Sequence, residues 1–324
     1  MLCVLIALVS VVLTSWWEPG QAMPPFAGLA QWLGMSVPTH SPAPTATAWA
    51  DVAGSPSPVT TPTWTPATSD ALRISPQGCT SAGQSPAPHG YAIYSASSLA
   101  GARGEVALTF DDGPSPTYTP QILAILRQYG AEATFFVVGR HAQLYPDIVR
   151  AELLANNAVG NHTYTHAVLP QLSAPAARWE MHATTSALDT IMGGSCMWLF
   201  RPPYGAVNST VLGIARREGL TTVLWDVDAQ DWLRPPAQVI AARIIVQLHS
   251  GAIILLHDSA PDGEYGDRSR TVAALPAILK AIYAKGYRAV TLPALLHDAG
   301  FTAETAPGTF AQEAPPPLLV VGAE

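Results

Sequence analysis

The sequence predicts an α/β fold, a distorted (β/α) barrel of about seven strand–helix units. Between residues 89 and 298, short apolar segments alternate with helical patterns, such as 106–110 followed by 119–128, and 253–256 followed by 272–283. This alternation indicates a parallel sheet covered by helices. Carboxylate, imidazole and guanidinium side chains directly follow several of the apolar segments. Barrels of this class carry their active sites at that end of the strands.

The first informative strand ends on two adjacent carboxylates. Residues 106–110 are apolar and β-prone, Asp111 and Asp112 follow, and Gly113-Pro114 breaks the segment at once. We expect the side chains of Asp111 and Asp112 to point to opposite sides, as neighbours along a strand do. Two carboxylates so close repel each other, so a cation or a positive side chain must separate their roles.

Two histidines follow in the segment His-Thr-Tyr-Thr-His at 162–166. Imidazoles four residues apart lie on one face of a helical turn, so we expect His162 and His166 to reach one metal ion. With Asp112 they would form a site with open coordination positions, which is typical of catalytic metals. Histidines that bind no metal are the alternative. A metalloprotease helix requires a Glu directly after the first histidine, and this segment has none between its two histidines. Non-haem iron oxygenases also use two His and one carboxylate, but nothing else in the chain suggests oxygen chemistry.

The segment Phe-Arg-Pro-Pro-Tyr-Gly at 200–205 supplies a positive side chain. Its two prolines favour a rigid loop over a helix. On such a loop Arg201 could pair with Asp111 and keep it ionised while Asp112 serves the metal. An ordinary surface turn is the alternative.

Two further apolar segments end in polar side chains. Residues 224–232 indicate a strand end followed by a loop that carries Asp231, and residues 253–258 indicate an apolar strand that ends on His257. A nearby Asp231 would raise the pKa of His257 and fix its tautomer, as a general acid requires. The alternative is a core histidine.

Taken in order, these segments resemble the polysaccharide deacetylase family, the NodB-homology carbohydrate esterases of family 4. The resemblance covers about residues 89–298 and rests on five motifs: Thr-Phe-Asp-Asp-Gly-Pro at 109–114, His-Thr-Tyr-Thr-His at 162–166, Arg-Pro-Pro-Tyr at 201–204, Asp-Ala-Gln-Asp-Trp at 228–232 and Leu-Leu-His at 255–257. It implies a NodB-type distorted barrel. Asn157 stands where relatives usually have Gly, and we expect it to be tolerated as a left-handed helix cap.

The resemblance also implies the roles of the site residues. A divalent metal, zinc in first place with cobalt or nickel as alternatives, would be held by Asp112, His162 and His166. Catalysis would be carried out by Asp111 as the general base, Arg201 as its partner, His257 as the general acid and Asp231 as its tether. The substrate would be bound by the backbone N–H of Tyr204, which stabilises the oxyanion, and by Trp232 and Leu255, which wall the acetyl pocket.

Composition narrows the choice of partners. The 324-residue chain has a formal net charge of −7 and a pI near 5.7, which argues against nucleic-acid binding. A hydrophobic content of 48% is ample for a core. The single predicted barrel and its polar linker favour a monomer.

The regions outside the catalytic segment differ from it in composition. Residues 1–22 suit a signal peptide or a short membrane anchor, although no Lys or Arg precedes Arg73, which favours a true start upstream of Met1. Residues 23–88 form a Pro/Ser/Thr/Ala-rich linker and residues 299–324 a Pro/Ala-rich tail. Export would allow a disulfide between Cys79 and Cys196; two free thiols are the alternative.

We therefore expect a secreted or cell-surface, metal-dependent hydrolase that removes N-acetyl groups from an extracellular glycan. Peptidoglycan is the first substrate and chitin-type N-acetylglucosamine the second. An O-acetyl esterase acting on xylan-type polysaccharide is one alternative. A non-catalytic glycan-binding relative is another, but the family's metal ligands, base and acid are all present at their motif positions.

Overall fold

The computed structural model describes residues 91–97, 104–194, 197–261 and 266–298. Every strand pair in these ranges is parallel, and the strands form one sheet in the order β1-β6-β5-β4-β3-β2-β8-β7, with β9 also paired to β2. The strands are β1 (Ala92–Ile93), β2 (Glu105–Asp111), β3 (Thr134–Val137), β4 (Ala158–Asn161), β5 (Leu199–Phe200), β6 (Thr221–Val223), β7 (Val227–Asp228), β8 (Ile253–His257) and β9 (Arg288–Val290). The curled parallel sheet confirms the distorted barrel.

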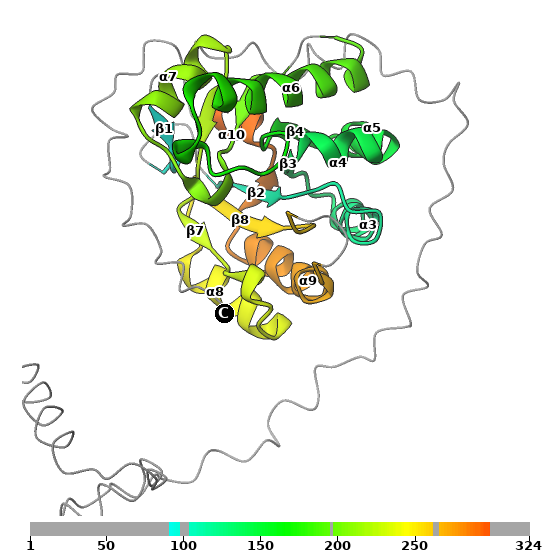
Figure 1. Ribbon diagram of the computed structural model, residues 1–324. Helices are drawn as coiled ribbons and strands as arrows, with labels where there is room; N and C mark the ends of the chain where they lie inside the picture. Colours follow the sequence, from blue (N-terminus) through cyan, green and yellow to red (C-terminus); the bar gives the residue numbers. More distant parts are fainter. Residues whose placement is uncertain (1–90, 98–103, 195–196, 262–265, 299–324) are drawn as a thin grey trace, which may run out of the picture. The chain divides into compact units, whose positions relative to one another are not determined.

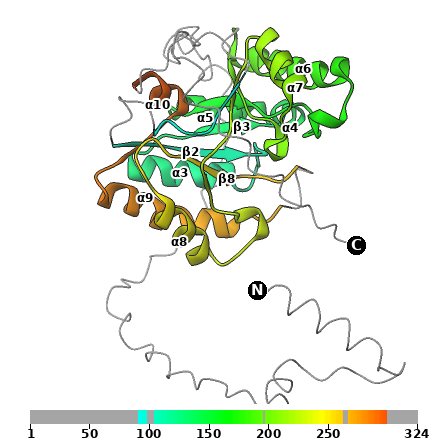
Figure 2. The same cartoon turned by 90° about the vertical axis from the view of Figure 1, so that its left-hand side faces the viewer.

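Helices cover the sheet, as the alternating pattern predicts. They are α3 (Thr119–Tyr129), α4 (Gly139–Leu144), α5 (Pro146–Leu154), α6 (Ala174–Met192), α7 (Ser209–Arg217), α8 (Ala237–Gln247), α9 (Ser269–Ala284) and α10 (Leu292–Asp298), with short 3-10 turns η2 (Leu169–Gln171), η3 (Pro203–Gly205) and η4 (Asp231–Leu233). Strands β2 and β8 lie between α8 and α9 on one side and α6 and α7 on the other (Figures 1 and 2). The helices expected at 119–128 and 272–283 lie inside α3 and α9.

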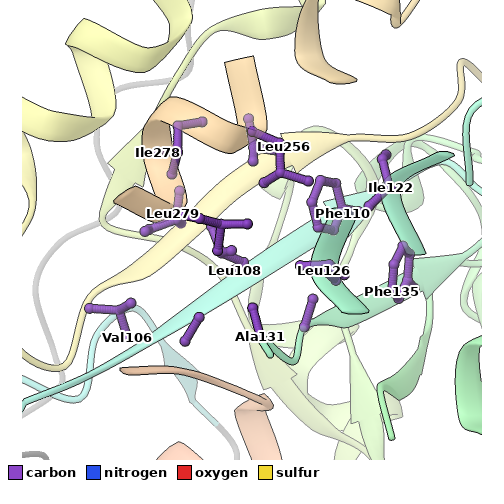
Figure 3. Close-up of a cluster of buried hydrophobic side chains, with 14 of the residues drawn as sticks. Val106, Leu108, Phe110, Ile122, Leu126, Ala131, Phe135, Leu256, Ile278 and Leu279 are labelled. Atoms are coloured by element: carbon purple, nitrogen blue, oxygen red, sulfur yellow. The ribbon is translucent and has the colours of Figure 1, made fainter. Parts of the chain in front are cut away.

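The packing of the core determines which face of β2 each of its side chains takes. Val106, Leu108 and Phe110 point to one side of β2 and pack against side chains of β8, α3 and α9 (Figure 3). Ala107 belongs to a second buried cluster, so the strand alternates between two apolar environments. Burying a side chain such as Leu or Phe contributes about 1.5–3 kcal/mol, and this fixes which face each residue takes. Asp111 therefore lies on the face that also carries Ala107 and Thr109.

The parallel arrangement brings the ends of four strands to one edge of the sheet. Asp111 ends β2, His162 follows β4, Arg201 follows β5 and His257 ends β8. In the sheet β5 is next to β4 and β2 is next to β8, with β3 between β4 and β2. The residues that the sequence singled out are therefore gathered where barrel enzymes place their active sites.

Asn157 has a different role from the one expected. The left-handed residue after α5 is Asn156, with a φ of 61°, so the prediction that Asn157 caps the helix was wrong. The Asn157 side chain is buried, accepts a hydrogen bond from the Ala133 N–H at 2.9 Å and donates one to the Glu152 carbonyl at 3.1 Å. It therefore ties the end of α5 to the segment before β3.

Several predictions fall on residues outside the described ranges. They are the leader at 1–22, the linker at 23–88, the tail at 299–324, and Cys79 and Cys196. Within the described part of the chain, no helix combines the length and the apolar character needed to cross a membrane.

Candidate active site

Asp112, His162 and His166 form a compact buried cluster. One potential ligand atom from each residue lies within 4.8 Å of the other two. The Nε2 atom of His166 is 3.1 Å from Asp112 Oδ1, and that of His162 is 3.5 Å from the same oxygen. Nitrogen and carboxylate donors in this number can hold a metal ion and leave coordination positions open.

The two histidines reach this point from a loop. Strand β4 ends at Asn161, and residues 162–166 are neither helix nor strand, so the expected helical turn was wrong. Thr163 and His166 have φ values of 65° and 63°, in the left-handed region. These two reversals, rather than helical spacing, bring the imidazole rings to a centroid distance of 5.0 Å.

The two adjacent carboxylates also converge. Asp112 has a φ of 77°, which turns the chain as it leaves β2. As a result, Asp111 Oδ2 lies 3.9 Å and Asp112 Oδ1 3.5 Å from the same atom, His162 Nε2. The prediction that these side chains point to opposite sides was wrong because a strand's alternation ends where its backbone becomes left-handed.

The donor atoms suit a cation. Asp112 Oδ1 is buried and accepts no hydrogen bond from the described residues. The Nδ1 atom of His162 donates to the Arg201 carbonyl oxygen at 2.7 Å, which leaves Nε2 to bind a ligand. Burial lowers the pKa of His166, which favours the neutral ring that metals bind. A carboxylate oxygen thus faces imidazole nitrogens in a buried space, where a divalent ion would satisfy all of them.

Arg201 is fully buried beside the cluster and holds Asp111. Its Nη1 atom donates to Asp111 Oδ1 at 2.8 Å and to Thr109 Oγ1 at 2.6 Å. The Nε and Nη2 atoms donate to the carbonyl oxygens of Val223 and Leu224 at 3.2 and 2.9 Å. The planar guanidinium is therefore fixed by several groups, and Asp111 has one oxygen paired and one facing His162.

Asp231 fixes His257 on the other side of β2. Asp231 Oδ1 pairs with His257 Nδ1 at 2.7 Å, and Oδ2 accepts from the His257 backbone N–H at 2.9 Å and from Thr271 Oγ1 at 2.7 Å. Burial acts to lower the pKa of His257, but the Asp231 carboxylate and the charges of Asp112 and Asp111 outweigh it and raise the pKa to about 9. Thr271 was not predicted, because nothing in its local sequence marks it.

The three residues expected to bind substrate differ in exposure. Tyr204 is 63% exposed, has a φ of 61°, and sets its ring edge against His166 at a centroid distance of 4.7 Å. Trp232 is 43% exposed, so it is not a core aromatic. Leu255 is 3% exposed and lies two residues before His257 in β8, in register with Thr109. Tyr204 thus borders the histidine cluster, and Trp232 follows the residue that holds His257.

A parallel barrel with an Asp/His/His cluster at the carboxyl edge of its strands is the arrangement of an α/β enzyme with a catalytic metal site. Residues 100–223 match the family described as Polysaccharide deacetylase. A chitooligosaccharide deacetylase from Azorhizobium caulinodans is 36% identical over 197 residues, covering 59% of this chain and 94% of the relative. A peptidoglycan-N-acetylglucosamine deacetylase from Bacillus cereus is 40% identical over 193 residues, which cover 59% of this chain and 87% of the relative.

A solved structure agrees with these relatives. The peptidoglycan deacetylase PdaC from Bacillus subtilis superposes with a TM-score of 0.55 at 35% identity, covering 61% of this chain and 92% of that one. The chain therefore belongs to the polysaccharide deacetylase family, and it is a hydrolase of that family. The resemblance and the fold expected from the sequence are both confirmed.

Proposed function

We propose that this chain hydrolyses N-acetyl groups of an extracellular glycan, peptidoglycan or a chitin-type N-acetylglucosamine polymer, and releases acetate in a metal-dependent reaction. The observation that carries the proposal is that the Asp112–His162–His166 cluster and two polar pairs, Asp111–Arg201 and Asp231–His257, lie at the same edge of the sheet. The names of the relatives, which include deacetylases of both kinds of glycan, support the choice of substrate.

In this proposal Asp112, His162 and His166 hold a divalent metal, zinc in first place, with cobalt or nickel as alternatives. A bound metal ion of this kind polarises the carbonyl group and lowers the pKa of water toward about 7. The chain presents one carboxylate and two imidazoles from the buried segments that follow β2 and β4. These side chains are already close together, so they need to move little when the ion binds.

Asp111 acts as the general base. Arg201 holds its Oδ1 atom at 2.8 Å, which leaves Oδ2 to take a proton from the attacking water. Because Arg201 is itself fixed by backbone carbonyl oxygens and Thr109, the free oxygen of Asp111 keeps one position through the reaction.

His257 acts as the general acid that protonates the departing amine nitrogen. With a pKa of about 9 it carries its proton at neutral pH, and the pair with Asp231 at Nδ1 leaves Nε2 as the donating atom. The backbone N–H of Tyr204 stabilises the negative charge on the carbonyl oxygen, and Trp232 and Leu255 line the pocket for the acetyl methyl group.

We also propose that the protein acts as a monomer outside the cytoplasm, secreted or held at the cell surface. The apolar segment at 1–22 and the Pro/Ser/Thr-rich segment at 23–88 support this location. Cell fractionation with an antibody to the catalytic region tests it, and a purely cytoplasmic protein would contradict it.

The experiment that tests the reaction is acetate release by the full chain from peptidoglycan, chitin oligomers and acetylated xylan. We expect release from the first or second substrate. Release from xylan alone would identify an O-acetyl esterase. No acetate release from any of the three substrates, together with binding to one of the glycans, would identify a non-catalytic relative.

A further inference from the structure

Glu180 of α6 lies against the loop that connects the two histidines. The residue is 5% exposed, and Oε2 of its carboxylate accepts hydrogen bonds from the backbone N–H groups of Tyr164 and Thr165, each at 2.8 Å. The other oxygen, Oε1, accepts from Thr165 Oγ1 at 2.6 Å. Three hydrogen bonds from two adjacent loop residues thus end on one carboxylate.

Within the described residues, hydrogen bonds rather than an ion pair hold this carboxylate. Among the described residues, no Arg, Lys or His side chain forms an ion pair with Glu180, whereas Glu218, which also contacts α6, pairs with Arg178 and His182. A buried carboxylate is costly unless it is well hydrogen-bonded. The loop supplies the bonds that let Glu180 stay buried, and charge-assisted bonds of this kind in turn hold the loop firmly.

The two imidazoles that this loop carries are fixed in different ways. The His162 ring is oriented directly, because Nδ1 donates to the Arg201 carbonyl oxygen. The Nδ1 atom of His166 is buried and has no hydrogen-bond partner in the described part of the chain. The rings of Tyr204 and His162 pack against the His166 ring, at centroid distances of 4.7 and 5.0 Å. The position of His166 therefore depends on its backbone more than that of His162 does.

That backbone is strained and needs support. Thr163, a β-branched residue, and His166 both have positive φ values, which persist only where the surroundings enforce them. Asn161 Oδ1 accepts from the Thr163 N–H at 2.9 Å and holds the first half of the loop. Glu180 holds the second half, directly before His166.

We propose that Glu180 is a positioning residue that sets His166 for metal binding. It acts through the backbone of residues 164–165 and has no contact with the ion. The inference rests on the proposed metal site and adds a residue outside the five sequence motifs.

The test compares Glu180→Met with Glu180→Gln in the full chain. Methionine has a similar size but leaves both loop N–H groups without their acceptor. Glutamine can accept both N–H bonds through its carbonyl oxygen and donate to Thr165 Oγ1, so it restores the geometry without the charge. Ile191→Ala, on the buried face at the other end of α6, is the control for a general loss of stability.

Two readouts do not depend on turnover. The first is zinc affinity by competition with a chromophoric chelator, and the second is the visible spectrum of the cobalt-loaded protein, which reports ligand geometry. We expect Glu180→Met to bind zinc about 10–100-fold more weakly and to change the cobalt spectrum, as losing support behind a ligand does. Glu180→Gln and Ile191→Ala should remain within about threefold of the wild-type affinity and keep its spectrum, as a hydrogen-bonding rather than a charge effect predicts.

A Glu180→Met protein with wild-type zinc affinity and cobalt spectrum would overturn the inference. An equal loss in Ile191→Ala would also overturn it, since the effect would then be one of stability alone. If Glu180→Met fails to fold, Thr165→Val, which removes one of the three bonds at an exposed position, takes its place with the same expected direction. Failure of the wild-type chain to bind zinc or cobalt would instead contradict the proposed function.

Discussion

The carboxylate of Asp231 holds His257 twice, through the ring Nδ1 at 2.7 Å and through the backbone N–H at 2.9 Å. The first contact sets the charge and tautomer of the ring, and the second fixes the end of β8 from which the ring projects. One buried residue therefore controls both the proton and the position of the proposed acid.

Asp231→Asn tests this control. With Asp231 in place, the proposed acid is protonated until the pH passes its pKa of about 9, so activity should fall only above that value. Without the carboxylate the pKa drops, and the alkaline limb of kcat should move to lower pH, with a loss of about 10²–10⁴-fold at neutral pH. A kcat–pH profile measures both, and an unmoved alkaline limb would contradict the assignment.

The same pair should affect stability in a defined direction. The folded-state pKa of His257 lies above the unfolded value of 6.5, so the pairing stabilises the fold fully below about pH 6.5 and loses this contribution as the pH rises through about 9. The unfolding free energy of the wild type should therefore exceed that of Asp231→Asn by more at pH 6 than at pH 10. Urea titrations at the two pH values measure it, and a constant difference would argue against the pairing.

Thr271 should support Asp231 from α9. Its hydroxyl donates to Asp231 Oδ2 at 2.7 Å, and the residue is 1% exposed. Thr271→Val keeps the shape but leaves the carboxylate short of one donor, so we expect a loss of about 1–3 kcal/mol in unfolding free energy, and a lower kcat as Asp231 becomes less firmly ionised. Thr271→Ser, which keeps the hydroxyl, should restore kcat; if valine and serine behave alike, the hydrogen bond has no role.

Asp111→Asn separates the base from the metal site. Asparagine can still accept from Arg201 through its side-chain oxygen but cannot take a proton from water. We expect activity to fall by about 10²–10⁴-fold while metal content stays at the wild-type level. Acetate release and elemental analysis of the same preparation measure the two quantities. Activity above a few per cent of wild type would contradict the assignment of the base.

Arg201→Lys tests the buried ion pair as a structural element. Lysine cannot reproduce the guanidinium's contacts with Asp111, Thr109 and two backbone carbonyl oxygens. We expect a loss of about 3–5 kcal/mol in unfolding free energy. Arg150→Lys is the control: its pair with Asp147 is partly exposed and should change stability by no more than about 0.5 kcal/mol. Equal effects at the two positions would contradict this account.

Much of the fold could be predicted because its signals are local. The apolar run of β2, the glycine and proline that end it, and the helical patterns inside α3 and α9 each depend on neighbouring residues. The same is true of the motif residues, since a strand end and the polar side chains after it are adjacent in sequence. The parallel sheet then brings the strand ends together.

What the sequence did not predict depends on contacts between distant segments. The left-handed backbone at Asp112 and His166 has only a weak local signal, because Asp and His tolerate positive φ but adopt it where tertiary contacts enforce it. Glu180 and Thr271 lie 15 and 40 residues from Thr165 and Asp231, the residues whose side chains they hold. Both are ordinary helix positions in sequence and become informative only once the fold is known.

The central claim is that activity requires a metal ion held by Asp112, His162 and His166. The most direct test is acetate release from an N-acetylglucosamine polymer by the full chain after chelation and after zinc is restored, with His162→Ala in parallel. We predict that chelation abolishes release, that zinc restores it in the wild type, and that His162→Ala neither binds zinc tightly nor recovers. Undiminished release by protein verified to be metal-free, or wild-type release by His162→Ala, would contradict the account.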